Sequence, residues 1–465
     1  MALAQAAVPQ ITDNKYRIEI FQGPLLAPIH VTALGGAYVA FAQDTEGSAV
    51  NAAAPAVRDP YSVSWFDYDV SVGVSAPGLF GGHNTNFDNP GTFSNVSNPL
   101  TGNYVDLNFG LTLQLGELGI GATGDLEQFS LTNASQGSPG LTMQIGRWKA
   151  LGAYGFFDGR LVLGGGARIL TMQIQQDRGP TLLTMTGGAP EVGALYMPTG
   201  LQWRLGAAAR AAVAGGPLGN ENVTTDPITN LHRVGTFVLP SSVTLPWEVE
   251  MGIAYQLGPR PLNPGWENPH DQEGWLRQRI ADARAERALL HDSEVAMAPP
   301  EARTRRVAEL EAEENEQRAA EDQELADASK KLYEERTARY ENWPRERILL
   351  LGSVLLSGPS DDAVSLEGFL NHAVEAVGRK LTATPRLGLE GEPLRDRMIL
   401  RVGTYVEPSR YEDVTPRQHF TFGGDVRLFP VDLWGLIPRA NLKLGFFIDL
   451  APRYQNYGLG IGNWH

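Results

Sequence analysis

Residues 105–115, VDLNFGLTLQL, alternate apolar and polar side chains without a break. Successive side chains of a β-strand point to opposite faces of a sheet, so this stretch predicts a strand with one apolar face and one polar face. The apolar face carries Val105, Leu107, Phe109, Leu111, Leu113 and Leu115, and the polar face carries Asp106, Asn108, Gly110, Thr112 and Gln114.

The same alternation recurs along most of the chain, in residues 66–76, 247–257 and 441–450 among others. The 52 Gly residues also suit many strands joined by turns. Counting each alternating run once gives about fourteen predicted strands. The further runs begin near Leu118, Leu141, Arg160, Glu191, Leu201, Arg345, Thr384, Arg397, Gln418 and Tyr454.

The connections between these runs alternate between short and long. Short connections are expected at 115–118, 157–160, 197–201 and 391–397, and long ones at 77–103, 130–140, 177–190, 214–245 and 358–383. Bacterial outer-membrane barrels have short turns at one end and long loops at the other. A soluble β-sandwich or barrel, the alternative, would have loops of similar length at both ends.

We therefore predict an all-β protein, an antiparallel transmembrane β-barrel of about fourteen strands. In such a barrel the polar strand faces line the lumen, where charges of both signs can pair with one another or with a plug. The candidate lumen-lining residues are Asp67, Asp69, Asp106, Arg204, Glu248, Glu250, Arg401 and Lys443.

Residues 262–344 interrupt the strand pattern with charged, helical sequence. This insertion lies at the end with short turns, so we expect a helical arm in the periplasm, with two helices joined at Pro299-Pro300. Its apolar positions are sparse, which favours a solvated helical hairpin over an obligate coiled coil. It contains 20 acidic and 12 basic residues, a net charge of −8 that would attract a partner with a basic surface.

Residues 34–57, LGGAYVAFAQDTEGSAVNAAAPAV, precede the first strand and fit neither a clean helix nor a clean strand. They resemble the start of the outer-membrane long-chain fatty-acid transporter (FadL) family, where a GGAYVA pattern is followed by Asp and Asn-Pro-Ala. The family's Asn-Pro-Ala is replaced here by residues 51–56, NAAAPA, so the turn in that region is expected to differ. Residues 239–257 and 397–429 are also similar to segments of the family.

This resemblance implies a small hatch inside the barrel and passive uptake of hydrophobic molecules, such as fatty acids. It also covers a related branch, the PorV-type barrels, which act as scaffolds for secretion or surface attachment. Small residues would let the hatch pack closely against the strands, and its polar side chains would satisfy backbone groups. The hatch residues implied are Gly35, Gly36, Tyr38, Asp44, Asn51 and Pro55.

Composition argues against several other classes of function. The net charge of −15 and pI near 5.1 argue against a nucleic-acid partner, and the absence of Cys excludes thiol chemistry. The eight His show no spacing that would form a catalytic site, and no segment has the ligand spacing of an EF-hand. We therefore expect neither an enzyme nor a resident metal or cofactor.

The predicted organisation is an N-terminal segment and hatch at 1–64, strands one to eight at 65–261, the arm at 262–344 and strands nine to fourteen at 345–465. Residues 4–6, AQA, resemble the end of a secretory signal that was trimmed, or match it by chance. The location expected is the bacterial outer membrane, in contact with its lipid. Two functions stay open: a FadL-like channel for hydrophobic small molecules, and a PorV-like scaffold that docks a periplasmic or secreted protein through the arm.

Overall fold

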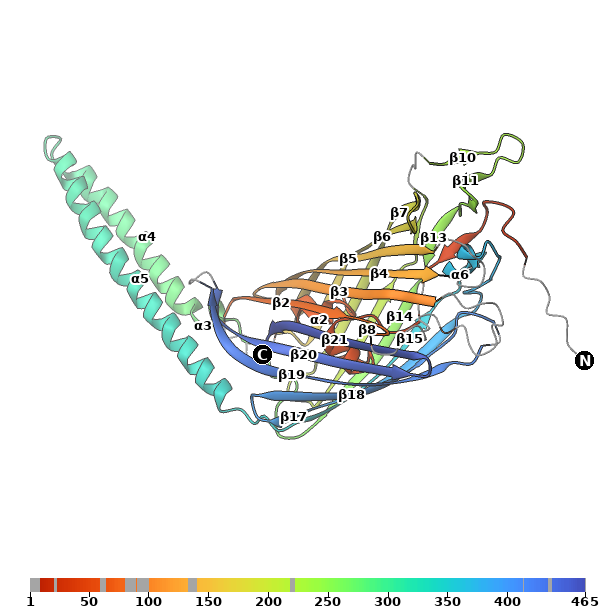
Figure 1. Cartoon of the computed structure of the whole chain (residues 1–465). Helices are drawn as coiled ribbons and strands as arrows, with labels where there is room; N and C mark the ends of the chain where they lie inside the picture. Colours follow the sequence, from red (N-terminus) through yellow and green to blue (C-terminus); the bar gives the residue numbers. More distant parts are fainter. Residues whose placement is uncertain are drawn as a thin grey trace, which may run out of the picture. The chain divides into compact units, whose positions relative to one another are not determined.

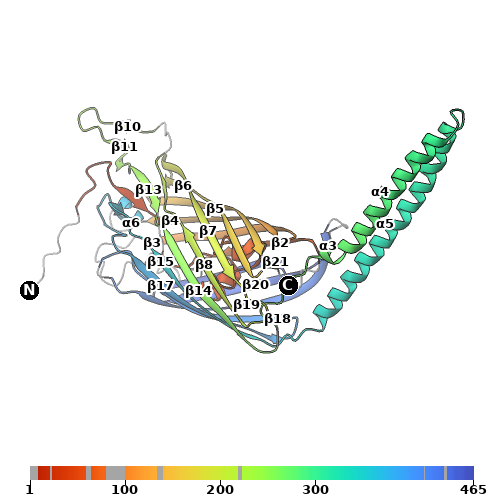
Figure 2. The ribbon, with the colours of Figure 1, turned by 180° about the vertical axis from the view of Figure 1, so that it is seen from behind.

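The fold is built around a closed antiparallel β-barrel of fourteen strands (Figures 1 and 2), which confirms the predicted fold class. The computed structural model describes residues 9–20, 23–58, 64–79, 89, 100–132, 140–217, 222–412, 414–433 and 437–464. The strands are β2 (Phe66–Ser75), β3 (Leu100–Leu115), β4 (Leu118–Thr132), β5 (Leu141–Phe156), β6 (Leu161–Gln176), β7 (Thr181–Tyr196), β8 (Trp203–Arg210), β14 (Glu248–Leu257), β15 (Ile348–Ser357), β17 (Thr382–Leu394), β18 (Met398–Glu407), β19 (Arg417–Leu433), β20 (Ile437–Ala451) and β21 (Tyr454–Asn463).

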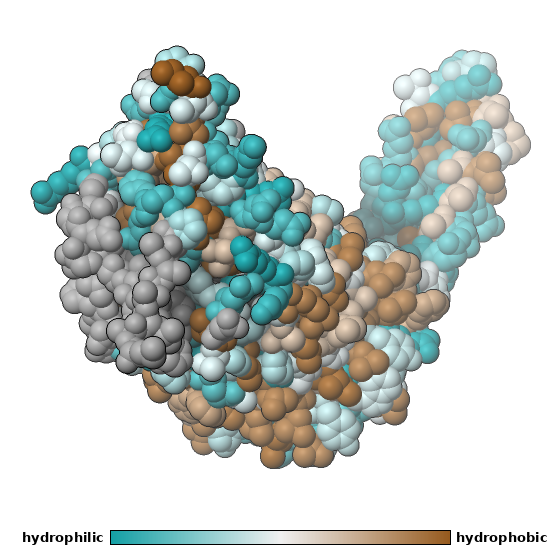
Figure 3. All heavy atoms as spheres, turned by 90° about the vertical axis from the view of Figure 1, so that its right-hand side faces the viewer, coloured by the Kyte–Doolittle hydropathy of each residue, from teal (hydrophilic) through white to brown (hydrophobic). Residues whose placement is uncertain are grey.

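The barrel wall has an apolar outside and a polar inside. On β2, Val70, Val72 and Val74 are exposed, whereas Asp69 and Ser71 are buried against the interior. Strand β21 pairs with β2 from Ser71↔Gly462 to Ser75↔Gly458 and closes the sheet, so the wall has no open edge. Figure 3 shows apolar side chains gathered on the wall and hydrophilic ones over the loops. An outer apolar surface of this kind is typical of barrels in a lipid bilayer.

The two ends of the barrel differ. One end, the short-turn rim, has the connections at 116–117, 157–160, 197–202 and 395–397, and the chain leaves there at Leu257 for the insertion. The other end, the long-loop rim, has the connections at 76–99, 133–140, 211–247, 358–381 and 408–416.

The prediction of a loop at 177–190 is wrong, because β7 begins at Thr181 and pairs with β6 along its whole length. This part of β7 turns Leu183 and Met185 inward and places Thr184 and Thr186 on the other face. Here the apolar face is the inner one, which reverses the polarity of the wall nearer the short-turn rim. A prediction that expects apolar side chains on the outer face of every strand therefore misses the first part of β7.

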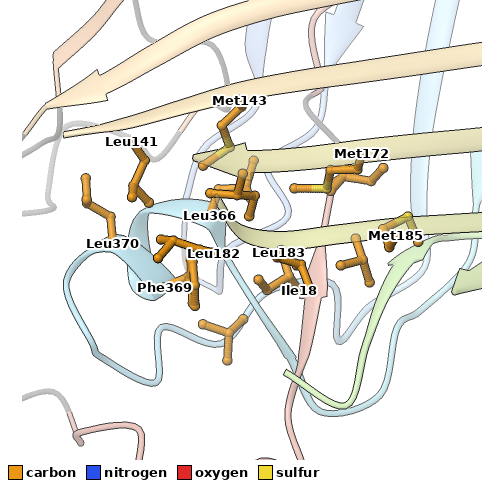
Figure 4. Close-up of a cluster of buried hydrophobic side chains, with 14 of the residues drawn as sticks. Ile18, Leu141, Met143, Met172, Leu182, Leu183, Met185, Leu366, Phe369 and Leu370 are labelled. Atoms are coloured by element: carbon orange, nitrogen blue, oxygen red, sulfur yellow. The ribbon is translucent and has the colours of Figure 1, made fainter. Parts of the chain in front are cut away.

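Apolar side chains fill the lumen at the long-loop rim. Strand β1 (Arg17–Glu19) lies parallel between β13 (Ser242–Leu245) and β16 (Ala363–Val364), with β9 (Val213–Gly215) at the edge of the same small sheet. A second small sheet comprises β10 (Thr224–Thr225), β11 (His232–Val234) and β12 (Phe237–Val238). The short helix α6 (Leu366–Leu370) packs beside β1. Figure 4 shows how side chains from β1, α6 and β5 to β7 meet, including Ile18, Leu141, Met143, Met172, Leu182, Leu183, Met185, Leu366, Phe369 and Leu370.

Residues 29–57 lie inside the barrel and are called the hatch. They form two five-residue helices, α1 (Ile29–Ala33) and α2 (Asp44–Ser48), and a 3-10 turn, η1 (Ala54–Ala56). Contacts of α1 with β18 to β21, and of η1 with β3 to β6, show that the hatch touches two different parts of the wall. Both ribbon views show these elements among the strands (Figures 1 and 2).

Residues 265–343, together with 64–67 just before and at the start of β2, group into a second compact unit. Its helices are α3 (Pro269–Gln272), α4 (Gly274–Met297) and α5 (Arg303–Glu341). The Asn268 side chain caps α3 by accepting a hydrogen bond from the His270 backbone N–H. Leu276, Ile280 and Leu310 are the buried apolar side chains of this helical hairpin among the described residues. No helix in the described part of the chain is long and apolar enough to cross a membrane.

Candidate functional site: the hatch and the lumen cavity

The N-terminal part of the chain runs through the lumen from the long-loop rim to the short-turn rim. Near the long-loop rim, Glu19 of β1 receives two hydrogen bonds from the Arg410 guanidinium, at 2.6 and 3.0 Å. Further in, the Leu25 backbone N–H donates to the Tyr405 hydroxyl at 3.1 Å. Beyond the hatch, Arg58 donates to the Gly116 carbonyl at 2.8 Å, in the turn between β3 and β4. Residues 59–63, which belong to the predicted N-terminal segment, lie outside the described residues.

Helix α2 is held by wall groups at both of its ends. At its N-terminus the Thr45 backbone N–H donates to the Asp69 carboxylate at 2.7 Å. After its C-terminus, the Lys149 ammonium donates to the Ala49 carbonyl at 2.7 Å, and the Arg210 guanidinium donates to the Val50 carbonyl. An acidic group at the start of a helix and cations at its end both complement the helix dipole. The wall charges therefore fix the direction of α2 across the lumen.

Inward-facing glycines on many strands let the hatch approach the wall backbone. A Cβ added to Gly206 would lie 2.2 Å from the Val39 carbonyl oxygen, and one added to Gly403 would lie 2.3 Å from the Gly35 nitrogen. No side chain fits at such distances. Glycines that would meet the hatch within 3 Å are Gly110, Gly119, Gly121, Gly164, Gly193, Gly206, Gly252, Gly388, Gly403, Gly423 and Gly460.

The predicted hatch residues Gly35 and Gly36 form the turn after α1. Both have positive φ, 61° and 79°, a conformation that favours glycine. A Cβ on Gly35 would also lie 2.7 Å from the Thr404 nitrogen of β18. These two glycines therefore form a turn that needs a left-handed backbone conformation and that lies directly against the wall.

The predicted residue Asn51 ties the hatch to itself and to the wall. Its Nδ2 donates to the carbonyls of Val39 at 2.9 Å and Ala194 at 3.3 Å, and its Oδ1 accepts from the Ala53 backbone N–H at 3.0 Å. Four residues later, the Pro55 carbonyl accepts from Gln114 of β3 at 3.0 Å. Pro55 lies in η1, four residues after Asn51, so the turn here differs from one in which Pro directly follows Asn.

The predicted residues Tyr38 and Asp44 lie near each other in the hatch interior. Tyr38 is fully buried, with its ring 4.6 Å from that of His30. Burial raises the pKa of the Tyr38 hydroxyl well above its ordinary value, and the negative charge of Asp44 adds to the rise. Asp44 begins α2 with a positive φ of 60°.

A buried charge cluster joins α1 and α2 to strands β17 to β20. Arg401 is paired with Glu390 at 2.8 Å and with Asp425 at 2.8 Å. Lys443 reaches from the wall to Glu46 of α2 at 2.8 Å, and Glu46 also accepts from the His30 backbone N–H. Burial lowers the pKa of the His30 imidazole, and the positive charge of Arg401 lowers it further. His30 is therefore a neutral member of this cluster at neutral pH.

A second charge cluster surrounds the C-terminal end of α2. Glu248 pairs with Arg168 at 3.1 Å, and Glu250 pairs with Arg386 at 3.0 Å. Arg386 also donates to the Gly36 carbonyl at 3.4 Å, so it reaches the hatch directly.

The remaining lumen candidates are placed differently. Arg204 donates to Asn263 at 2.7 Å and to Gln43 of the hatch at 3.3 Å, near the short-turn rim. Asp106 is buried on β3 opposite Glu127 of β4, away from the two clusters around α2. Asp67 is half-buried at the start of β2. Asp106 thus lies farther from α2 than the candidates that contact the hatch, such as Asp69 and Lys443.

Sequence reasoning missed several residues that hold the hatch. They include Lys149 and Arg386 on the wall, and His30 and Glu46 in the hatch. Lys149 does lie at an inward position of an alternating strand, and this signal could have found it. Its target is a backbone carbonyl, which has no signature in the sequence.

A cavity of about 200 Å³ lies between the hatch and the wall. Its hatch side is formed by residues 23–28, with Leu25 and Leu26, and by 49–50. Apolar wall residues and a set of cations complete the lining. The apolar ones are Leu170, Val213, Leu245 and Leu355, and the cations are Arg147, Lys149, Arg168, Arg210 and Arg386, beside Asp125, Glu248 and Glu250. Among the described residues no group of three or more His, Asp or Glu is arranged to hold a metal ion.

No protein-family model matches the chain, and no curated protein matches it. Solved structures do match. The Pseudomonas aeruginosa FadL homologue has a TM-score of 0.49 and 10% identity, covering 94% of this chain and 98% of its own. The P. putida toluene transporter TodX has a TM-score of 0.48 and 10% identity, covering 95% and 99%. The CymD monoaromatic hydrocarbon channel has a TM-score of 0.48 and 9% identity, covering 94% and 96%. One of these three is thus a homologue of the family that the sequence resembles.

Proposed function

We propose that the protein is a bacterial outer-membrane channel for the passive transport of hydrophobic small molecules. The observation that carries this proposal is the lumen cavity, which is lined by both apolar and charged side chains and lies against the hatch. It lies next to the apolar cluster of the long-loop rim, since Ile20 and Leu170 belong to both. A hydrophobic molecule would meet apolar surface from that rim down to the hatch, and would leave the lumen when the hatch moves.

The size of the cavity limits what it holds at rest. An apolar cavity of about 150 Å³ is large enough to bind benzene. The cavity of about 200 Å³ would therefore accept a single aromatic ring or the end of an acyl chain. A longer ligand would have to displace residues 23–28 or part of the hatch.

The cavity cations extend the proposal to ligands with an anionic end, such as fatty acids. Lys149, Arg210 and Arg386 line the cavity and also donate to carbonyls of the hatch. A carboxylate forms stronger hydrogen bonds with such cations than a neutral carbonyl does. A fatty acid in the cavity would compete with the hatch for these donors, so that its binding would loosen the hatch.

Deletion of residues 1–50 tests the hatch. It removes both α1 and α2, so it should turn a closed barrel into one that conducts ions steadily in planar bilayers. Conductance of the truncated protein at the level of the full chain would contradict the assigned role of the hatch.

Ligand uptake tests the channel itself. Proteoliposomes with the full chain should take up a fatty acid faster than empty liposomes. Replacement of Lys149 by Met should slow this uptake more than the uptake of a neutral monoaromatic hydrocarbon. Equal rates with and without the protein for both probes would exclude transport.

Docking of a protein partner through the arm stays a separate prediction, and loss of a co-purifying protein on removal of residues 265–343 would support it.

A further inference from the structure

Exposed aromatic side chains mark the short-turn rim of the barrel. Tyr154, Phe156, Tyr196 and Tyr255 are all exposed near the strand ends at this rim, and Phe157 follows in the adjoining turn. The ring centroids of Tyr196 and Trp203 lie 5.7 Å apart, and those of Tyr154 and Phe156 lie 4.9 Å apart. Aromatic side chains concentrate where a membrane meets water, so this belt places the short-turn rim at the boundary of the bilayer.

The arm carries its own aromatic residues only near its base. Trp266, Trp275, Tyr333, Tyr340 and Trp343 flank the hairpin, whereas residues 276–332 contain no Phe, Tyr or Trp. Trp275 is 68% exposed and Tyr333 is 52% exposed, which is unusual for large aromatic side chains in a water-solvated hairpin.

Short chain segments connect this base to strands β2 and β15. Trp65 directly precedes the first residue of β2, and its ring stacks on that of His270 with centroids 5.1 Å apart. Trp275 follows His270 by five residues, which corresponds to about 8 Å of helix. On the return side, Trp343 precedes Ile348 of β15 by five residues, which span at most about 18 Å.

Charge separates the base from the rest of the arm. Residues 284–324 contain 12 acidic and six basic residues, a net charge of −6. The base, 265–283 and 325–343, contains eight acidic and six basic residues, a net charge of −2. Strong negative charge opposes contact with a phospholipid surface, whereas a nearly neutral, aromatic surface suits the headgroup region. The distal part is therefore the poorer match for lipid.

We infer that the base of the arm is a lipid-binding surface, which inserts Trp275 and Tyr333 into the phospholipid headgroup region. This inference concerns the membrane contact of the arm and does not depend on transport by the lumen.

Site-directed spin labelling of the full chain in phospholipid nanodiscs tests the inference. The sequence contains no Cys, so a single introduced Cys is the only site that takes the label. Gln278→Cys places the label one turn after Trp275 and leaves that ring intact, and Glu301→Cys places it between the two long helices as the matched control. Both positions are exposed. Accessibility is measured to molecular oxygen, which is enriched in lipid, and to a water-soluble nickel complex.

At position 278 we expect nickel accessibility about threefold lower than at position 301, with oxygen accessibility higher, because the headgroup region excludes the complex. A control without lipid is impossible, because the barrel cannot be transferred to detergent-free water. The second comparison is therefore the variant that combines Trp275→Ser with Gln278→Cys, set against Gln278→Cys alone. That change should raise nickel accessibility toward the value at 301 while the barrel stays folded. Equal nickel accessibility at 278 and 301 in the otherwise unchanged chain would overturn the inference.

Discussion

Ion pairs occur both in the cluster between the hatch and the wall and in the helical hairpin of the arm, but the burial of these pairs differs. The Arg401 side chain is 1% exposed and that of its partner Glu390 is 0% exposed. In the arm, the Arg305 side chain is 87% exposed beside Glu309. A buried pair becomes very costly when one partner is lost, whereas an exposed pair contributes little. The buried pairs of Arg401 therefore hold strands β17 to β19 together beside the hatch, and the arm relies on many weak contacts.

Replacement of Arg401 by Met should have the largest effect. It leaves the carboxylates of Glu390 and Asp425 buried without their shared cation, and we expect a loss of about 3–5 kcal/mol in unfolding free energy. Thermal unfolding in detergent, followed by the shift in gel mobility on heating, measures the change.

The matched control for Arg401→Met is Arg305→Met, which removes the same charge from an exposed pair of the arm. This variant should stay within about 0.5 kcal/mol of the unchanged chain. Similar losses in the two variants would contradict the contrast between lumen and arm.

Gly206→Ala should have the next largest effect, because the added methyl group would meet the Val39 carbonyl and the Ala40 Cα within 2.5 Å. Overpacking of this kind costs about 1–3 kcal/mol, and here it would push the hatch away from β8. We expect raised ion conductance in planar bilayers. Gly152→Ala is the control, since a Cβ at Gly152 on β5 has nothing within 4 Å. Unchanged conductance in both variants would show that the hatch adapts.

The sequence predicted the barrel well because alternation and membrane exposure are local properties of each strand. It failed at Thr181–Pro190, where the apolar side chains of β7 face inward onto the rim cluster. The partner of that apolar face includes Ile18, which is far away in sequence, so no local pattern reveals it. Distant packing thus overrides the polarity expected of a membrane strand.

For the hatch, the resemblance to the FadL family indicated Gly35, Gly36 and Asn51, which match the family's pattern. The wall groups that hold α2, Lys149 and Arg210, donate to backbone carbonyls that every residue possesses. Only the three-dimensional path of the hatch selects Ala49 and Val50 as their acceptors. On the wall, the alternation of the strands predicted Asp69, Arg204 and Lys443, which contact the hatch, but it did not predict Lys149.

The smallest expected effect is the pH dependence of the association of the two arm helices, which exposed ion pairs hold together. Hydrogen bonds from Arg287 hold the pKa of the Glu314 and Glu321 carboxyls below their ordinary value of 4.5. A carboxyl whose pKa is lowered by folding stabilises the fold above its unfolded pKa, and this stabilisation is lost as pH falls through the folded pKa. We therefore expect the two helices to remain associated at pH 7 and to separate more often below about pH 4.5.

Distances between spin labels at Ala285→Cys and Gln317→Cys measure this separation. Both positions are exposed, and neither takes part in the ion pairs between the helices. The distance distribution should broaden on acidification, and at pH 7 it should broaden partly in 1 M salt, where the screening length falls to about 3 Å. A narrow distribution at pH 3 would mean that Leu276, Ile280 and Leu310 hold the hairpin without the charges. The arm would then resemble the lumen in depending on its few buried contacts.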